Sequence, residues 1–331
     1  MNASKNITQK DIKKCLQIIG KLKKYYSDRI VGQSALQTSL LITIMANGHI
    51  LLESVPGLAK TTAAKVITNA VNGKFSRIQC TPDLLPSDII GTQIFNYSTN
   101  TFETKTGPIF ANFFLLDEIN RSSAKTQSAT LEAMQERQVT IDGVSYKLPD
   151  IFVVIATQNP IETEGTYILA DAQLDRFLIK EIIDYPTIQE EIEILNRFEN
   201  KVFDDNKAVL KLSDLDFLQK ITEKVYIDDS IKKYISQLML ATRQPYNYID
   251  RNLADYIEMG SSTRGAIAFM QCSKALALIN GRDHVIPEDI KAIRYSVLRH
   301  RISLNFSAVA DGVSVEQIID AIFGAIPTPW N

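Results

Sequence analysis

The sequence predicts an α/β fold in two parts: a parallel five-stranded sheet flanked by helices, with two β-hairpin inserts, and then a smaller all-helical domain. Short apolar runs rich in β-branched residues alternate with helical segments as far as Pro186, which is typical of a mostly parallel sheet covered by helices. From Thr187 onward only helical segments remain. A chain of 331 residues usually forms more than one core. We therefore expect an α/β domain over residues 1–186 and a helical domain over residues 187–331.

Each element follows from its local pattern. A first helix is expected within residues 5–24, because apolar residues recur there at helical spacing. The lysines of that segment are expected to form a solvated face rather than a nucleic-acid-binding arm. Five apolar runs predict the strands of the sheet: residues 49–53, 75–80, 113–116, 151–156 and 178–183. In the second half, helical patterns cover residues 190–195, 215–225, 230–242, 263–279 and 287–297.

Two segments predict hairpins that project from the sheet. Residues 139–146 alternate apolar and polar side chains on both sides of Asp142 and Gly143, and an Asp-Gly pair is a strong hairpin signal. Residues 94–104 alternate in the same way around a turn at residues 98–100. The hairpins are either decorations of the sheet edge or working protrusions, and the residues alone leave both interpretations open.

Composition indicates an unsecreted protein of the reducing cytoplasm. The net charge is −2, with 45% hydrophobic and 22% charged residues, so nothing calls for a polyanionic partner, and nucleic acid is disfavoured. Cys15, Cys80 and Cys272 are far apart, which predicts neither a disulfide framework nor a zinc site. The three histidines are equally scattered and are expected to be structural or surface residues. No apolar run approaches the length that spans a bilayer.

Residues 49–67, HILLESVPGLAKTTAAKVI, have the layout of a phosphate-binding loop between a strand and a helix. Such a loop needs backbone N–H groups, a helix amino terminus, a lysine for the β- and γ-phosphates and a hydroxyl for Mg²⁺. Ser54 and Ala59 stand where the common pattern G-x-x-x-x-G-K-[ST] has glycines. The predicted nucleotide contacts of the loop are Val55, Pro56, Gly57, Leu58, Ala59, Lys60, Thr61 and Thr62.

Two adjacent carboxylates, Asp117 and Glu118, follow the apolar run 113–116. In P-loop enzymes an Asp at this strand end holds Mg²⁺, and a following Glu can deprotonate the attacking water. The alternative is an acidic turn that caps the next helix. Because a phosphate loop occurs in the same chain, we predict Glu118 as a catalytic residue and Thr61 and Asp117 as the Mg²⁺ ligands.

Asn159 follows the run 151–156. Parallel strands deliver their carboxyl ends to one edge, so Lys60, Asp117 and Asn159 are expected to meet in one crevice. There Asn159 would hydrogen-bond the γ-phosphate or the attacking water. Taken alone, an Asn-Pro pair only signals a turn.

Two arginines complete the predicted catalytic set. Arg176 immediately precedes the last predicted strand, where a neighbouring subunit could meet it; the alternative is a salt bridge with Asp175 or with other residues around it. Arg264 lies at the amino end of the helix expected over 263–279, where a cation opposes the helix dipole. It therefore has no evident structural benefit there, and an anionic phosphate would supply one.

The chain resembles a MoxR-type AAA+ ATPase over nearly its whole length. The resemblance rests on many short blocks in order, which together are far more specific than any single motif. These blocks are RIVGQ (29–33), LLESVPGLAKT (51–61), TPDLLPSD (81–88), LLDEINR (115–121), LEAMQERQVT (131–140), ATQNP (156–160), AQLDRF (172–177) and VLRHRI (297–302).

The resemblance implies a P-loop AAA+ core and a lid, and it assigns a role to each matching residue. Ile30, Val31 and Gly32 would border the adenine of ATP. In the family's terms, Lys60 and Thr61 belong to Walker A, Asp117 and Glu118 to Walker B, Asn159 is sensor 1, Arg176 the arginine finger and Arg264 sensor 2. An alanine before the lysine is familiar in this family, whereas Ser54 remains a departure. The two hairpins match inserts that handle substrates or partners.

These implications lead to one main functional hypothesis. ATP and Mg²⁺ are the expected cofactors, and the expected partners are further copies of the chain in a ring, as a hexamer, and a protein with a von Willebrand factor A domain. The protein would act as a chaperone-like remodelling or maturation ATPase. A slowly hydrolysing nucleotide-dependent switch is the alternative, and a nucleic-acid-dependent motor is the third hypothesis, which the net charge disfavours.

Overall fold

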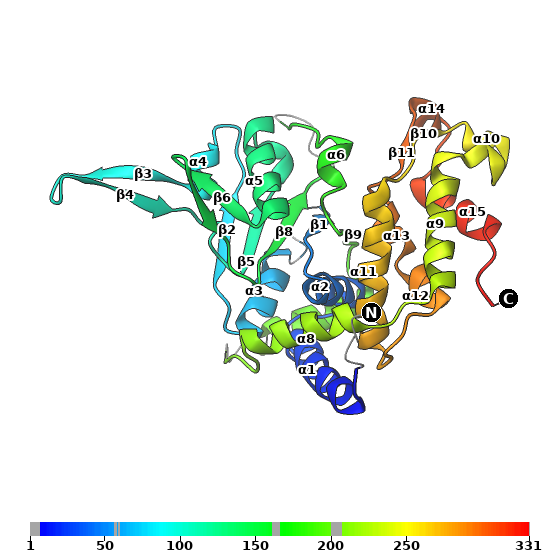
Figure 1. Cartoon of the computed structure of the whole chain (residues 1–331), viewed down its shortest axis with the longest axis horizontal. Helices are drawn as coiled ribbons and strands as arrows, with labels where there is room; N and C mark the ends of the chain where they lie inside the picture. Colours follow the sequence, from blue (N-terminus) through cyan, green and yellow to red (C-terminus); the bar gives the residue numbers. More distant parts are fainter. Residues whose placement is uncertain (1–6, 56–57, 59, 161–165, 200–206, 331) are drawn as a thin grey trace, which may run out of the picture. The chain divides into compact units, whose positions relative to one another are not determined.

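The computed structural model describes residues 7–55, 58, 60–160, 166–199 and 207–330, and the chain forms two compact units (Figure 1). The core unit comprises Ile18–Leu169 and Glu181–Asp216, and the helical unit comprises Met1–Gln17, Ala170–Lys180 and Phe217–Asn331. The predicted domain boundary at residue 186 stays a prediction. The compact units differ from it, because residues 187–216 group with the sheet and residues 170–180 group with the helices.

A five-stranded sheet organises the core unit, as predicted, and its strand order is β2-β5-β8-β1-β9. The order differs from the order along the chain, so crossovers place β5 and β8 between β2 and β1. All the registered pairs of this sheet are parallel. The strands are β1 (Ile50–Glu53), β2 (Phe75–Gln79), β5 (Phe113–Asp117), β8 (Val153–Gln158) and β9 (Ile179–Ile182).

The two central strands show why the apolar runs fold in this way. Every residue of β5 is buried, and so are the first five residues of β8. A parallel sheet is covered on both faces, so its inner strands are apolar throughout rather than alternating. Helix α3 packs against β5, and α2 packs against β1. The helices of this unit are α2 (Ser34–Met45), α3 (Lys60–Ala70), α4 (Pro86–Ile90), the 3-10 helix η1 (Ile119–Arg121), α5 (Ala124–Glu136) and α7 (Ile188–Glu199).

Both predicted hairpins are present. Strands β6 (Gln138–Ile141) and β7 (Val144–Lys147) are joined by Asp142 and Gly143, which have φ of 48° and 80°. Positive φ at both central residues is the mark of the tight turn that an Asp-Gly pair favours. Strands β3 (Gly91–Asn96) and β4 (Thr101–Thr106) form the second, longer hairpin, drawn as a long arm in Figure 1.

His49 immediately precedes β1 and has a structural role, one of the two roles that the sequence predicts for the histidines. Its Nε2–H donates to the Met134 carbonyl (3.1 Å), and its Nδ1 accepts from the Val154 N–H (3.0 Å). The ring is therefore neutral in the folded protein. Burial is the main reason that the pKa of His49 falls from 6.5 to about 3.

We expect His49 to make the fold sensitive to mild acid. The unfolded chain takes up a proton below pH 6.5, whereas the folded chain resists protonation until about pH 3. The stability that neutral His49 contributes is therefore present above pH 6.5 and is lost as the pH falls from 6.5 to about 3. Between about pH 7.5 and about pH 5.5, the wild type should lose about 1 kcal/mol more unfolding free energy than a His49→Gln variant.

Urea unfolding at the two pH values measures this difference. Replacing the exposed His284 by Gln is the matched control and should change the pH dependence less. An identical pH dependence in the wild type and in His49→Gln would contradict the assignment.

The helical unit is built around α11 (Thr263–Ile279), which packs against α9, α12 and α13. The predicted helical segments are present, and the unit also contains a short antiparallel pair, β10 (Ile257–Met259) with β11 (Ser303–Leu304). These strands are too short to produce an alternating pattern. The other helices of this unit are α6 (Asp171–Leu174), α9 (Asp229–Arg243), η2 (Pro245–Asn247), α10 (Arg251–Ala254), α12 (Pro287–Ala292), α13 (Arg294–Leu298), α14 (Phe306–Ala310) and α15 (Val315–Ala325).

Two helices and one strand extend over both units: α1 (Gln9–Ser27), α8 (Leu212–Lys224) and β9, whose residues 179–180 group with the helical unit. The inward side chains of α1 include Cys15, Ile19 and Leu22, which are almost fully buried. Cys15, Cys80 and Cys272 are buried free thiols. Among the described residues, no helix combines the length and the apolar character needed to cross a bilayer.

Candidate nucleotide site

Three neighbouring strands bring the predicted core-unit residues to one edge of the sheet. In the parallel register, Leu52 of β1 pairs with Thr157 of β8, and Leu116 of β5 pairs with Ala156 of β8. Lys60 lies in the segment after β1, Asp117 and Glu118 lie at the end of β5, and Asn159 directly follows β8. The carboxyl ends of β1, β5 and β8 are thus adjacent, which is the position at which open α/β sheets bind ligands.

The loop after β1 leads into α3, whose first residue is Lys60. The Lys60 side chain is buried, and its Nζ donates to the Ser54 carbonyl (3.3 Å). The first turn of α3 contains no acidic residue, so the positive end of the helix dipole favours an anion there. Val55, Leu58, Thr61 and Thr62 are described and are at least partly exposed. The predicted contacts Pro56, Gly57 and Ala59 lie outside the described residues.

Asp117 ends β5 with its carboxylate largely buried. Oδ1 accepts a hydrogen bond from Thr157 Oγ1 (2.6 Å), and Oδ2 accepts from Arg77 Nη2 (2.6 Å) and Nε (3.2 Å). The side chain of Arg77 is 44% exposed, whereas that of Asp117 is 10% exposed. The carboxylate is therefore fixed from the sheet side by Thr157 and from the solvent side by a more exposed arginine.

Glu118 adopts the left-handed conformation, with φ of 56°. Its N–H donates to Thr157 Oγ1 (2.8 Å), so one threonine orients both carboxylate residues. The Glu118 carboxylate accepts from Gln79 Nε2 (2.8 Å) and pairs with Arg121 Nε (3.2 Å). This arrangement rejects the simple capping interpretation, because helix α5 is capped by Ser123, whose Oγ accepts from the Thr126 N–H.

Removing the Thr157 hydroxyl should destabilise this edge of the sheet. A Thr157→Val variant keeps the shape but leaves the Glu118 N–H and one Asp117 oxygen without their shared partner. Because Thr157 and Asp117 are buried, we expect the unfolding free energy to fall by about 1–3 kcal/mol. Urea denaturation measures the loss. Thr157→Ser retains the hydroxyl and should recover most of it, and equal stability of Thr157→Val and wild type would contradict the assigned role.

Asn159 follows β8 and is buried. Its carbonyl accepts from Asn120 Nδ2 (3.4 Å). Asn120 Oδ1 is itself buried, with no hydrogen-bond partner among the described residues. Asn120 lies two residues after Glu118, and its buried oxygen can accept a hydrogen bond from a bound water or from another donor.

The residues predicted to border the adenine belong to the segment before α2. Ile30 is buried, Val31 is partly exposed, and Gly32 has φ of 65°. The positive φ favours glycine at this position, and a Cβ there would lie 2.1 Å from Glu190 Oε1, so the Glu190 side chain would have to move. Glu190 is held in the first turn of α7 by Thr187, whose N–H donates to it (2.8 Å).

The two predicted arginines belong to the helical unit. Arg176 lies between α6 and β9, and its Nε is buried with no hydrogen-bond partner among the described residues. Asp175 pairs instead with Arg301, whose Nε donates to Oδ1 (2.8 Å). The alternative interpretation, in which Arg176 pairs with Asp175, is therefore not what the structure shows.

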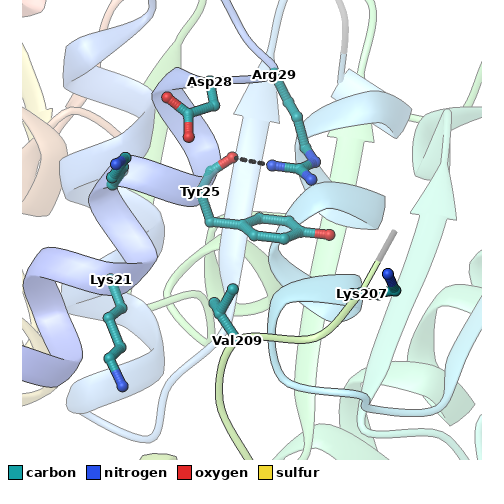
Figure 2. A pocket seen from close by; sticks show the side chains of 7 residues that line it. Lys21, Tyr25, Asp28, Arg29, Lys207 and Val209 are labelled. Carbon is teal, nitrogen blue, oxygen red and sulfur yellow. Dashed lines mark hydrogen bonds between the residues drawn. The ribbon is translucent and has the colours of Figure 1, made fainter. Parts of the chain in front are cut away.

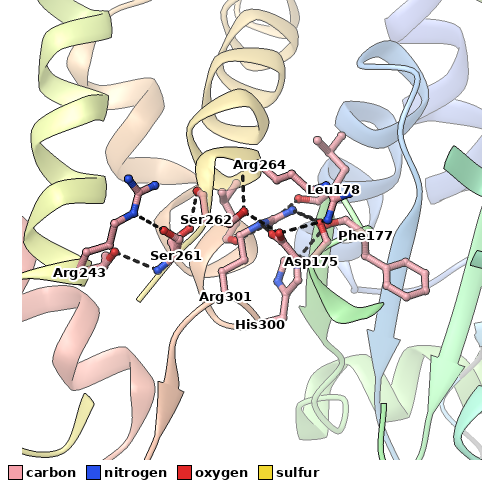
Figure 3. A network of polar contacts seen from close by, with 11 residues as sticks. Asp175, Phe177, Leu178, Arg243, Ser261, Ser262, Arg264, His300 and Arg301 are labelled. Carbon is pink, nitrogen blue, oxygen red and sulfur yellow. Dashed lines mark hydrogen bonds and ion pairs between the residues drawn. The ribbon is translucent and has the colours of Figure 1, made fainter. Parts of the chain in front are cut away.

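Arg264 requires a correction (Figure 3). The sequence indicates no evident structural benefit for Arg264 at this position, yet Arg264 Nη1 lies 3.7 Å from Asp175 Oδ2. Ser262 caps helix α11 by accepting from the Arg264 N–H (3.0 Å), and it donates to Asp175 Oδ2 (2.6 Å). Asp175 thus offsets the unfavourable placement of a cation at a helix amino terminus. The side chain of Arg264 remains 47% exposed.

The residues at the sheet edge fit a magnesium-bound triphosphate. The amino terminus of α3 with Lys60 suits an anion, and Thr61 and Asp117 offer the oxygen ligands that Mg²⁺ prefers. In the part of the chain that is described, no cluster of three or more His, Cys, Asp or Glu side chains could hold a metal. Mg²⁺ usually relies on one or two carboxylates together with substrate phosphates and water, so the carboxylate of Asp117 is a suitable contribution from the protein.

A separate cleft of about 510 Å³ lies in the core unit beside α1 (Figure 2). The Arg29 guanidinium stacks 3.5 Å above the Tyr25 ring and donates to the Tyr25 carbonyl (3.2 Å). The cleft shares no residue with the predicted nucleotide site. Its lining residues are Lys21, Lys24, Tyr25, Asp28, Arg29, Lys207 and Val209.

Sequence reasoning missed several residues that hold the site together. Arg77 and Gln79 come from β2, and the parallel pairing of β2 with β5 brings them beside Asp117 and Glu118. Arg77 and Gln79 are two residues apart, so they lie on the same face of β2, but nothing in the local sequence indicates which residues they contact. Arg301 lies within the block VLRHRI, but its contacts with the segment around Arg176 arise from tertiary packing and have no local signal.

Comparisons with known proteins agree with this geometry. Residues 49–179 match the model of the ATPase family associated with various cellular activities (AAA), and residues 250–322 match the AAA lid domain. Chaperone MoxR1 of Mycobacterium tuberculosis is 43% identical over 91% of this chain and 79% of its own length. Protein MoxR of Paracoccus denitrificans is 29% identical over 91% of this chain and 93% of its own length.

A solved structure agrees as well. The crystal structure of a presumed ATPase from Cytophaga hutchinsonii is 45% identical, covers 96% of this chain and 97% of its own, and has a TM-score of 0.89. Together with the parallel sheet, the helical unit and the phosphate-loop layout, these matches show that the chain belongs to the MoxR family of AAA+ ATPases.

Proposed function

We propose that this protein hydrolyses ATP in the presence of Mg²⁺. The observation that carries the proposal is the convergence of three segments at one sheet edge: Lys60 at the start of α3, the fixed pair Asp117 and Glu118 after β5, and Asn159 after β8. A buried lysine, a buried carboxylate and an oriented second carboxylate are the groups that phosphoryl transfer to water requires.

Each side chain has a distinct role in this proposal. Lys60 neutralises the β- and γ-phosphate oxygens, and Glu118 removes a proton from the attacking water, which Asn159 orients. Thr61 and Asp117 would hold Mg²⁺, Asp117 through water because its oxygens already accept from Thr157 and Arg77. When bound, the metal offsets the charge that develops on the phosphate oxygens. Arg264 contacts the γ-phosphate bound to its own chain.

Arg176 acts, in this proposal, on ATP bound to a neighbouring copy. Arg176 is partly exposed, as a guanidinium must be to meet an acceptor from another molecule. A site completed by unlike surfaces of two copies is a heterologous contact, which closes into a ring when the rotation permits. We propose a hexameric ring.

We further propose that ATP turnover drives the remodelling or maturation of a partner protein. One of the relatives is named as a chaperone. The β3–β4 hairpin supports the proposal, because it presents Phe95, Tyr97 and Phe102 with exposed fractions of 37%, 89% and 69%. Exposed aromatic residues of this kind are typical of protein-binding surfaces. The partner class implied by the family is a protein with a von Willebrand factor A domain.

Steady-state phosphate release tests the proposed activity. ATP is supplied with Mg²⁺ or with excess chelator over a range of protein concentrations. Turnover that requires Mg²⁺ and rises more steeply than protein concentration supports both hydrolysis and assembly. The absence of ATP binding and of turnover at every concentration would contradict the proposal. Turnover that is strictly proportional to protein concentration would contradict the shared site.

A further inference from the structure

The carboxylate of Asp175 connects three side chains of the helical unit (Figure 3). Oδ1 accepts from Arg301 Nε (2.8 Å), and Oδ2 accepts from Ser262 Oγ (2.6 Å). Arg264 Nη1 lies 3.7 Å from Oδ2. The residue that follows Asp175 in the chain is Arg176. The two arginines to which we assign roles at the phosphates are therefore tied to one carboxylate, one through the backbone and the other through a side-chain contact.

Arg301 holds the backbone on both sides of Arg176. Its Nη2 donates to the carbonyls of Asp175 (3.3 Å) and Phe177, and its Nη1 donates to the carbonyl of Leu178 (3.2 Å). It also donates to the carbonyl of Val297, one turn away in its own segment. The adjacent His300 donates from Nε2 to the Phe177 carbonyl (3.0 Å). The segment that carries Arg176 is thus clamped by side chains of residues 300 and 301.

The same clamp reaches the helix that carries Arg264. Ser262 accepts from the Arg264 N–H and donates to Asp175, so the cap of α11 is fixed by the carboxylate that Arg301 holds. A change in the position of Asp175 would therefore move the start of α11 together with the segment around Arg176. All these residues belong to one compact unit.

Packing alone does not account for an arginine at position 301. The side chain is 2% exposed, and burial lowers the pKa of Arg301, although the Asp175 carboxylate opposes that effect. A buried ion pair is seldom more stabilising than well-packed apolar residues of similar size. What a guanidinium provides is a rigid planar fork of donors that fixes several acceptors at once.

We propose that Arg301 is a positioning residue. Through Asp175 and the carbonyls around Arg176, it fixes the positions of Arg176 and Arg264 relative to each other, so that both can act in the same ATP-dependent cycle. The inference rests on the proposed ATPase function and adds to it a residue that does not touch the nucleotide. Its role is to hold two phosphate-directed arginines on one rigid element.

The test compares Arg301→Lys with Arg299→Lys in the full-length chain. Arg299 is a matched control, because it also pairs with a carboxylate (Glu316, 2.6 Å) and lies two residues away in the same segment. Lysine keeps the charge but cannot span the same acceptors. We expect Arg301→Lys to lower kcat by about 10- to 100-fold, since small misplacements of catalytic groups have effects of that size. ATP affinity should change far less, because Lys60 and the α3 amino terminus are intact.

Urea unfolding, circular dichroism and gel filtration report on the folded fraction and on assembly. If Arg301→Lys does not fold, Asp175→Asn takes its place: it preserves size, removes the shared charge and replaces one acceptor oxygen by an amide donor, so Arg301 and Ser262 can no longer donate to separate oxygens, and the same loss of kcat is expected. The proposal is overturned if kcat per folded, assembled protein equals that of Arg299→Lys, or if the loss appears in ATP affinity alone. Failure of the proposed function is distinguishable, because then the wild type itself would show no turnover.

Discussion

A Glu118→Gln variant should bind ATP as tightly as the wild type while losing nearly all hydrolysis. General-base catalysis typically contributes ~10²–10⁴ in rate, and we expect kcat to fall within or beyond that range. The structure gives the reason: the left-handed backbone at Glu118 and the Thr157 hydroxyl fix the residue beside Asp117 without burying its carboxylate completely. Glutamine preserves the size and the bond with Gln79 but cannot accept a proton from water.

Two measurements check this expectation. Calorimetry gives the affinity for Mg·ATP, and phosphate release gives kcat. Glu132→Gln on α5 is the matched control, because Glu132 is an exposed acid of the same unit outside the site, and its turnover should stay at the wild-type level. Full residual turnover in Glu118→Gln would remove the catalytic role of Glu118.

An Arg176→Ala variant should be nearly as inactive, for a different reason. An arginine finger supplied by a neighbouring molecule is typically worth ~10³–10⁵ in turnover. The folded chain already holds the segment around Arg176 through Arg301 and Asp175, so removing the guanidinium should leave the fold and ATP binding intact. Replacing Arg251, an exposed arginine at the start of α10 in the same unit, by Ala is the control and should leave kcat unchanged. Wild-type turnover in Arg176→Ala would refute the finger role.

The sheet and its hairpins could be predicted because their signals are local. The apolar runs of β5 and β8 are uninterrupted, as expected for strands covered on both faces, and Asp142 with Gly143 marks the β6–β7 turn by itself. The short pair β10 and β11 could not be predicted, since strands of two or three residues carry no periodicity. The predicted boundary at residue 186 depended on a change of pattern along the chain, whereas compactness depends on which surfaces pack together.

Residues of the candidate site could be predicted only where a reactive side chain lies at or after the end of a strand. Lys60, Asp117 and Asn159 each belong to a segment that follows an apolar run, so the parallel sheet places them at one edge. Arg77 could not be found, because its bond with Asp117 depends on the register of β2 against β5. The partner of Arg264 is Asp175, and only the tertiary fold brings them together.

We propose above all that the ATP site of one chain is completed by Arg176 of its neighbour. Subunit mixing tests this shared site most directly. Glu118→Gln and Arg176→Ala are each expected to be inactive alone. In a randomly mixed ring, about one quarter of the sites would combine an Arg176→Ala chain, whose Glu118 is intact, with a finger from a Glu118→Gln neighbour. Mixing Glu118→Gln with Arg264→Ala is the control, which should recover nothing because, in the proposed function, both residues act on the ATP of their own chain.

Recovery of turnover toward about a quarter of the wild-type rate in the first mixture, and none in the second, is the result that we predict. A first mixture that stays at the sum of its two inactive components, although gel filtration shows mixed assemblies, would contradict the shared site.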